Sequence, residues 1–107
     1  MIDPASLVSG AFQAFMSEAP EHARAWGAMV GGLAEASALD EKTSALAYVA
    51  VLAAQNLEGG IPFHVQAAKQ AGASREEVVS AILIGLPAAG LGVTQVLPAA
   101  IAAYDAP

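Results

Sequence analysis

The stretch AQNLEGGIPFHV, residues 54–65, carries the side chains of this chain that are best suited to acid–base chemistry. His64 is one of two histidines, and imidazole is the side chain whose ordinary pKa lies nearest to neutral pH. Glu58 precedes it by six residues in a turn with two glycines, so the bend could bring the carboxylate to the ring. That contact would orient the imidazole or raise its pKa. We therefore take His64 and Glu58 as the candidate catalytic residues.

Both residues also have a purely structural explanation. A histidine on an alanine-rich helix face can be a core residue whose second nitrogen bonds a backbone carbonyl, and a single histidine is weak evidence for a site. Glu58 can be a solvated loop carboxylate, as most glutamates are. The sequence leaves the chemical and the structural explanation open for each residue.

Other kinds of site have less support. Cysteine is absent, which excludes disulfides, thiolate metal ligands and catalysis by a thiol of this chain. His22 lies beside Glu18 and Glu21, but no second histidine follows at metal-site spacing, so we predict no metal. The glycines of GLPAAGLG follow no strand and lack the order of a phosphate-binding loop. No serine or threonine has a motif that would activate its hydroxyl, and we expect no cofactor.

The composition of the 107 residues indicates association between copies. It is 56% hydrophobic and 13% charged, which is more apolar surface than a lone small domain hides easily. The net charge is −6 and the four basic residues are scattered, so nucleic acid is not an expected partner. We expect one domain over residues 1–107, a homo-oligomer and a cytoplasmic location, since the N-terminal residues show no export signal.

An uncharged run over residues 78–104 is long enough for a membrane span by length alone. Pro87, Pro98 and a cluster of glycines divide it into two shorter segments. Buried helices of an oligomeric protein produce the same pattern. We therefore favour helices buried in protein over a membrane span.

The pattern is helical nearly everywhere and no segment alternates cleanly with period two, which predicts an all-α fold. We expect a first helix over about residues 4–16, with Asp3 as its cap and Pro4 in its first turn. A second helix is expected over about 20–36. It has large apolar side chains at helical spacing that should face a core, namely Trp26, Met29, Val30 and Leu33.

A third helix over about residues 41–55, with Asp40 as N-cap, is apolar on all sides and should be the most buried. The fourth has Pro62 in its first turn and ends before Gly72. Its periodicity places His64 on an inward face with three alanines. The opposite, outward face carries Gln66, Lys69 and Gln70.

A fifth helix opens with a capping box formed by Ser74 and Glu77 and continues to about residue 86. The segment GLPAAGLG interrupts the pattern, and a last helix is expected over about residues 93–104.

The segment LDEKTSALAYVAVLAAQNLEGGIPFHVQAAKQAGASREEVVSAILIG, residues 39–85, resembles the core of the carboxymuconolactone decarboxylase and AhpD-like superfamily. FHVQAAKQAGASREEV is the most specific part, and the likeness covers about residues 15–103. The resemblance implies an all-helical domain of about six helices. It also implies subunits that assemble into trimers, hexamers or related rings, with sites near the subunit interfaces.

The peroxidase branch of that superfamily carries two cysteines and a glutamate before a histidine. The matching positions here are Leu57, Gly60 and Ala45, and only the histidine, His64, is retained. Without a thiolate no attack on a peroxide is possible, so the resemblance does not extend to thiol peroxidase activity.

The decarboxylase branch lacks those cysteines and works without a metal or organic cofactor. Glu58 and His64 are a looser match to its acidic turn and histidine. A further histidine of that branch would fall near Ile84, where this chain has none, and basic residues that could hold a carboxylated substrate are scarce.

Two hypotheses follow. The first is a cofactor-free, lyase-type acid–base enzyme for a small organic acid or lactone, with His64 as general acid–base and Glu58 as its partner. The second is a non-catalytic oligomeric protein of the same fold that binds a small ligand or a partner. A redox protein that uses an external thiol is a third, less supported hypothesis.

Overall fold

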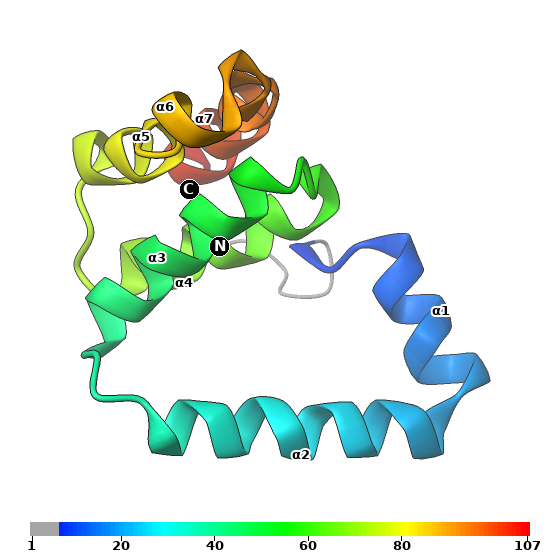
Figure 1. Ribbon diagram of the computed structural model, residues 1–107. Coiled ribbons are helices and arrows are strands. Elements are labelled where there is room, and N and C mark those ends of the chain that lie inside the picture. Colours follow the sequence, from blue (N-terminus) through cyan, green and yellow to red (C-terminus); the bar gives the residue numbers. More distant parts are fainter. Residues whose placement is uncertain (1–6) are drawn as a thin grey trace.

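The computed structural model describes residues 7–107, and every regular element within them is a helix (Figure 1). Six α-helices have nine residues or more: α1 (Gly10–Glu18), α2 (Pro20–Ala36), α3 (Glu41–Ala54), α4 (Ile61–Gln70), α5 (Arg75–Leu83) and α7 (Leu97–Asp105). Between them lie a single turn, α6 (Leu86–Ala89), and two 3-10 helices, η2 (Glu58–Gly60) and η3 (Leu91–Val96). The predicted all-α class with about six helices is confirmed. No helix within residues 7–107 is long and apolar enough to cross a membrane.

Side-chain caps start α3 and α5 where the sequence predicts them. The Asp40 carboxylate accepts a hydrogen bond from the Thr43 N–H at 2.8 Å. The Ser74 hydroxyl accepts one from the Glu77 N–H at 3.1 Å, and the Glu77 carboxylate accepts one from the Ser74 N–H at 2.8 Å. This reciprocal pair is the predicted capping box.

The first helix starts later than predicted. α1 begins at Gly10, because the Ser9 hydroxyl accepts a hydrogen bond from the Phe12 N–H at 3.1 Å and caps the helix there. Residues 7–9 therefore lie outside the helix, contrary to the predicted start at residue 4. The predicted cap, Asp3, and Pro4 lie outside the described residues.

Backbone hydrogen bonds at the end of α3 set the turn that leads to α4. Asn56 has a φ of 54°, and its N–H donates to the carbonyl of Ala53 at 3.1 Å. The N–H of Leu57 donates to the carbonyl of Leu52 at 2.9 Å, which completes a Schellman motif and reverses the chain. Gly72, with a φ of 101°, ends α4 in the same way, at the position that the sequence predicts.

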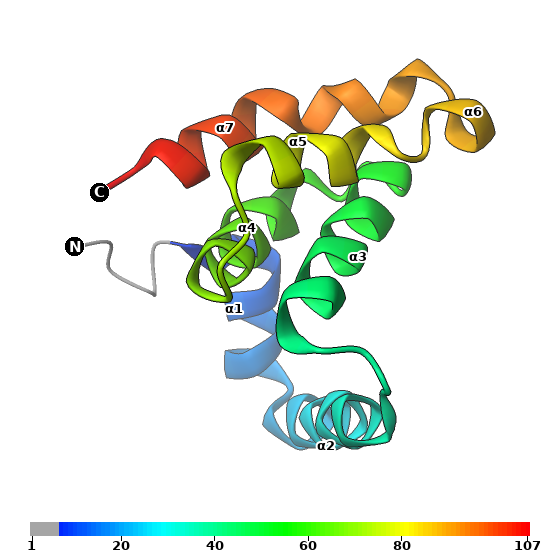
Figure 2. The same ribbon diagram turned by 90° about the vertical axis from the view of Figure 1, so that its left-hand side faces the viewer.

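The hydrophobic core lies between α3, α4, α5, η3 and α7 (Figures 1 and 2). α4 packs against α3 and α7, and α3 also packs against α5. The largest fully buried side chains are Val49, Ile61, Val65, Val78, Ile82, Val93 and Val96. Each contributes about 1.5–3 kcal/mol through burial of its apolar surface. These five elements therefore hold one another in place.

α4, and not α3, buries the larger part of its length. Four of the ten residues of α4 are buried, against three of the fourteen residues of α3. Tyr48 and Val51 of α3 are exposed. The prediction that the helix over 41–55 is the most buried is wrong, because its sequence is apolar on all sides but only one side meets the core.

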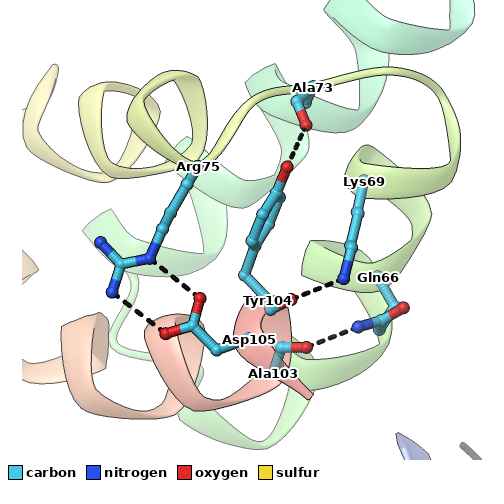
Figure 3. A network of polar contacts seen from close by, with 7 residues as sticks. All are labelled: Gln66, Lys69, Ala73, Arg75, Ala103, Tyr104 and Asp105. Atoms are coloured by element: carbon cyan, nitrogen blue, oxygen red, sulfur yellow. Dashed lines mark hydrogen bonds and ion pairs between the residues drawn. The ribbon is translucent and has the colours of Figure 1, made fainter. Parts of the chain in front are cut away.

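The core-facing side of α4 is rotated from the predicted one. Val65 and Ala68 lie in the core, and Gln66, which was predicted to face outward, is buried with them. The Gln66 amide donates a hydrogen bond to the carbonyl of Ala103 in α7 (Figure 3). A buried amide with a partner is tolerated in a core, so side-chain polarity alone does not set the face. His64 lies beside this core face and is partly buried.

Polar contacts fasten the end of α7 to the rest of the core (Figure 3). The Lys69 ammonium donates to the carbonyl of Tyr104 at 2.8 Å, and the Tyr104 hydroxyl donates to the carbonyl of Ala73 at 2.7 Å. The Arg75 guanidinium donates two hydrogen bonds to the Asp105 carboxylate, at 2.9 and 3.1 Å. Cations at the end of α7 also match the negative end of its helix dipole.

The last third of the chain is more divided than predicted. α5 ends at Leu83 and not near residue 86. The helix expected over 93–104 is divided into η3 and α7, and Pro98 lies in the first turn of α7, where its fixed φ is suited. Gly90, with a φ of 80°, separates α6 from η3.

α1 and α2 form an arm that stands apart from the core (Figures 1 and 2). The rings of Phe12, Phe15 and Trp26 meet edge to face, with centroids 5.1–6.5 Å apart, and join the two helices. The large apolar residues of α2, here called the α2 stripe, are all exposed: Trp26, Met29, Val30 and Leu33. The prediction that this stripe faces a core is wrong within one chain, because α2 packs chiefly against the short α1.

Candidate functional site

The site is built around the His64 side chain in the first turn of α4. Pro62 lies in the first turn of this helix, and the chain reversal after α3 brings the helix back beside α3. The His64 ring lies 4.4 Å from the ring of Tyr48 in α3, with a tilt of 46° between the planes. The ring of Phe63 meets it nearly edge-on at 5.1 Å. The imidazole is therefore bordered by two aromatic side chains from two helices.

The electrostatic surroundings favour the neutral form of His64. Burial lowers the pKa of the His64 imidazole below its ordinary value of 6.5, because a charged ring loses hydration there. Within residues 7–107 neither ring nitrogen has a hydrogen-bond partner on the protein. A neutral imidazole without a protein partner can accept a proton from a bound molecule at pH 7.

Glu58 and His64 are not brought together in this structure. Glu58 lies in η2, is exposed, and forms no hydrogen bond or ion pair with His64. The Schellman motif after α3 and the Ile61 N–H, which donates to the carbonyl of Glu58, fix the turn that carries Glu58. The expected contact between the Glu58 carboxylate and the His64 ring is not among the hydrogen bonds and ion pairs of residues 7–107.

The structure shows the surroundings of the three positions that match the two cysteines and the glutamate of the peroxidase branch. Leu57 is exposed, and Ala45 is partly buried against the core. A Cβ at Gly60 would lie 3.3 Å from Cδ2 of Leu52, so a side chain there would require Leu52 to shift. The positions of the two cysteines therefore carry no side chain that could do polar chemistry here.

Tyr48 is the polar residue near His64 that the sequence did not single out. It lies three residues after Ala45 and therefore on the same side of α3, where the peroxidase branch carries its glutamate. The sequence does contain a signal for Tyr48: after Ser44, every other side chain of this helix is small or aliphatic, and Tyr48 alone carries a ring and a hydroxyl group. The prediction that the whole helix is buried gave no reason to place this hydroxyl at a site.

The basic side chains of the chain are engaged away from His64. Lys42 pairs with Glu77 at 2.8 Å, and Lys69 and Arg75 hold the end of α7 (Figure 3). Arg24 pairs with Glu21 on α2. None of these four contacts involves His64. The described surroundings of the imidazole therefore contain no cation that could hold a carboxylate.

The described residues also give no support to a metal centre. Within 7–107 no group of three or more His, Asp or Glu side chains is arranged to hold a metal ion. His22 lies exposed on the arm.

Comparison with protein families gives one match. A model of the carboxymuconolactone decarboxylase family matches residues 20–105, which include α2 to α7. No significant match was found among curated proteins or solved structures.

Proposed function

The chain belongs to the carboxymuconolactone decarboxylase family, and on that premise we propose that it is a cofactor-free acid–base enzyme for a small lactone or organic acid. The observation that carries the proposal is His64. It is a partly buried imidazole with a lowered pKa, bordered by Tyr48, and without a hydrogen-bond partner among residues 7–107.

The proposed step is a proton transfer at carbon. Neutral His64 accepts a proton from the carbon beside a carbonyl group of the substrate, and the electron pair moves onto the carbonyl oxygen as an enolate. The Tyr48 hydroxyl, on the ring that contacts His64, is the donor that we assign to stabilise that oxygen. In an unsaturated lactone the imidazolium then returns the proton to the far carbon of the conjugated enolate. One C–H bond breaks, another C–H bond forms and the carbon–carbon double bond shifts, so that protons and electrons balance within the substrate and His64.

The surroundings of His64 favour a lactone over a free acid as substrate. A carboxylate in a partly buried site needs a cation or several donors, and the four basic residues are paired elsewhere. A lactone ring carries no charge and can pack against Tyr48 and Phe63. Glu58 stays a sequence-based prediction, since its exposed carboxylate makes no contact with the ring.

Replacement of His64 tests the proposal. His64→Gln keeps the size and polarity of the side chain but removes the titrating nitrogen, so turnover should fall by roughly 10²–10⁴-fold. The assay follows carboxymuconolactone and uncharged five-membered-ring lactones by proton NMR. Turnover equal to wild type on a substrate that the wild type converts would remove His64 from the mechanism. Glu58→Gln is the companion variant, and an unchanged pH profile would remove Glu58.

A non-catalytic role is the alternative. The observation that favours it concerns the two rings that contact the His64 ring among residues 7–107, Phe63 and Tyr48, of which Tyr48 alone carries a polar atom. In that case no lactone is converted, and native mass spectrometry recovers an unmodified small molecule bound to wild type and lost from Tyr48→Ala.

A further inference from the structure

Two contacts between α3 and the start of α4 lie one helical turn apart. A Cβ built on Gly60 would lie 3.3 Å from Cδ2 and 3.5 Å from Cδ1 of Leu52, so the backbone of Gly60 rests on the Leu52 side chain. Tyr48 lies four residues before Leu52 on α3. His64 lies four residues after Gly60, and its ring centroid is 4.4 Å from that of Tyr48. Residues four apart lie above one another on a helix face, so both contacts belong to one antiparallel pair of helices.

Space, and not the backbone conformation, requires a glycine at position 60. With a φ of −88° and a ψ of −12°, Gly60 has backbone angles that any residue can adopt. Carbon atoms that are not bonded to each other pack at about 3.5–4.0 Å. A methyl group at position 60 would therefore be too close to Leu52 by a few tenths of an ångström, and one of the two partners would have to move.

The turn before α4 gives way more easily than the Leu52 side chain does. Leu52 is 5% exposed and lies in the hydrophobic core, where close packing leaves a side chain little room to move. Its carbonyl also accepts the hydrogen bond from the Leu57 N–H that reverses the chain. Gly60 is partly buried and Gly59 before it is exposed, so outward movement of the turn meets less resistance. Such a movement displaces the start of α4, and His64 moves with it.

We propose that Gly60 is a positioning residue: because it has no side chain, the turn closes on Leu52, and this close approach sets the position of the His64 ring. The separation of two packed helices depends on the side chains at their contact, so the contact at Gly60 controls the contact with Tyr48 one turn away. Position 60 matches a cysteine of the peroxidase branch, and here it gives a close helix contact in place of a thiol. The effect of this contact on turnover rests on the proposed function, whereas its effect on the His64 ring does not.

Alanine at two adjacent glycines gives a matched test. Gly59→Ala adds the same methyl group as Gly60→Ala, and neither glycine has a φ in the left-handed region. Within residues 7–107, a Cβ at Gly59 would meet only the Cβ of Ser9, at 3.4 Å, which is ordinary van der Waals contact. Both changes restrict the unfolded chain to the same extent. A difference between the two variants therefore reports the contact with Leu52.

Proton NMR of the imidazole measures the position of the His64 ring. An aromatic ring shifts the resonances of protons close to it, so the His64 signals report the contact with Tyr48. In Gly60→Ala we expect these signals to move and the pKa of His64 to rise toward 6.5, because a displaced ring is less buried. In Gly59→Ala we expect the signals and the pKa to keep their wild-type values. His64→Gln identifies the signals, since His22 is the only other histidine.

Shortening of the Leu52 side chain should reverse the effect. Leu52→Val withdraws the methyl groups that meet position 60, so the double variant Gly60→Ala/Leu52→Val should regain the wild-type signals and pKa of His64. Turnover of a lactone that the wild type converts should fall about tenfold in Gly60→Ala, mainly through kcat, because misplacement of a reacting group by ~1 Å can cost roughly 100-fold. Turnover should recover in the double variant.

Two results would overturn the role of Gly60. One is a set of His64 signals and a pKa that are the same in Gly60→Ala as in Gly59→Ala, and the other is a double variant that keeps the changes of Gly60→Ala. If Gly60→Ala does not fold, a folded double variant with wild-type His64 signals supports the role, and a double variant that also fails to fold contradicts it. A wild type that converts no lactone would contradict the proposed function alone, since the NMR comparison still decides the role of Gly60.

Discussion

The α3–α7 core and the α1–α2 arm both consist of helices with large apolar side chains, but the chain covers those side chains in only one of them. Ile82 in α5 is fully buried, whereas Leu33 in α2 is the most exposed member of the α2 stripe. Both lie at positions that helical periodicity marks as apolar faces. The comparison shows that periodicity identifies the face of a helix that must be covered, and leaves open which molecule covers it.

The two regions also differ in how their parts are joined. In the core, side chains of α4 and α5 bond the end of α7, as Lys69 does with the carbonyl of Tyr104. In the arm, α1 and α2 are joined by the ring contacts of three aromatic residues. The core thus has its own packing and polar contacts, whereas α2 buries no residue against the rest of residues 7–107.

The largest expected effect is on unfolding of the core. Ile82→Ala removes a fully buried side chain from α5 and should lower the free energy of unfolding by about 2–5 kcal/mol. Leu33→Ala removes a side chain of similar size from the arm. Its effect on the free energy of unfolding should appear only at protein concentrations that populate an oligomer. Urea denaturation of both variants at two protein concentrations measures this. A loss for Leu33→Ala that is independent of concentration would mean that the arm is covered within one chain.

Removal of one hydroxyl group from each of two tyrosines should have a smaller effect. The Tyr104 hydroxyl donates to the carbonyl of Ala73, so Tyr104→Phe should cost about 0.5–1.5 kcal/mol. Tyr48 makes no hydrogen bond within residues 7–107, so Tyr48→Phe should leave the free energy of unfolding within about 0.5 kcal/mol of the wild-type value. Equal losses from the two variants would show that the Tyr48 hydroxyl is bonded in the folded protein.

The smallest expected effect is the titration of His64. Its folded pKa is lowered by burial, so the unfolded chain binds a proton more readily. The contribution of His64 to stability is therefore present above pH 6.5 and is lost as the pH falls from there through the folded pKa. Proton NMR of the imidazole should give a midpoint below 6.5. A midpoint above 6.5 would indicate a nearby carboxylate and would return Glu58 to the site.

Local signals in the sequence predicted the helix ends well. Asp40, Ser74 and Gly72 each act through hydrogen bonds or dihedral angles within a few residues, so their effect can be derived from the neighbouring sequence. The all-α class follows from the same periodicity. The start of α1 differs from the prediction because Ser9 caps the helix through the Phe12 N–H.

Properties that depend on distant residues were harder to predict. Gln66 was assigned to the outer face of α4, but its position depends on the carbonyl of Ala103, 37 residues away. The pairing of Glu58 with His64 rests on spacing alone, whereas a contact between the carboxylate and the ring depends on how α3 ends and on the turn that follows it. Tyr48 was missed because its contact with His64 arises from the packing of α3 on α4.

Hydrogen exchange of the α2 amides tests most directly the central claim, the expected homo-oligomer in which a second copy covers the arm. An uncovered 17-residue helix opens readily and exchanges fast, whereas a helix packed between two copies is protected. In wild type we expect α2 to be protected like α3 to α7. In Met29→Asp, which puts a charge in the α2 stripe, we expect α2 to lose its protection while the core keeps it. Fast exchange of α2 in wild type, at concentrations where α3 to α7 are protected, would contradict the claim that a second copy covers the arm.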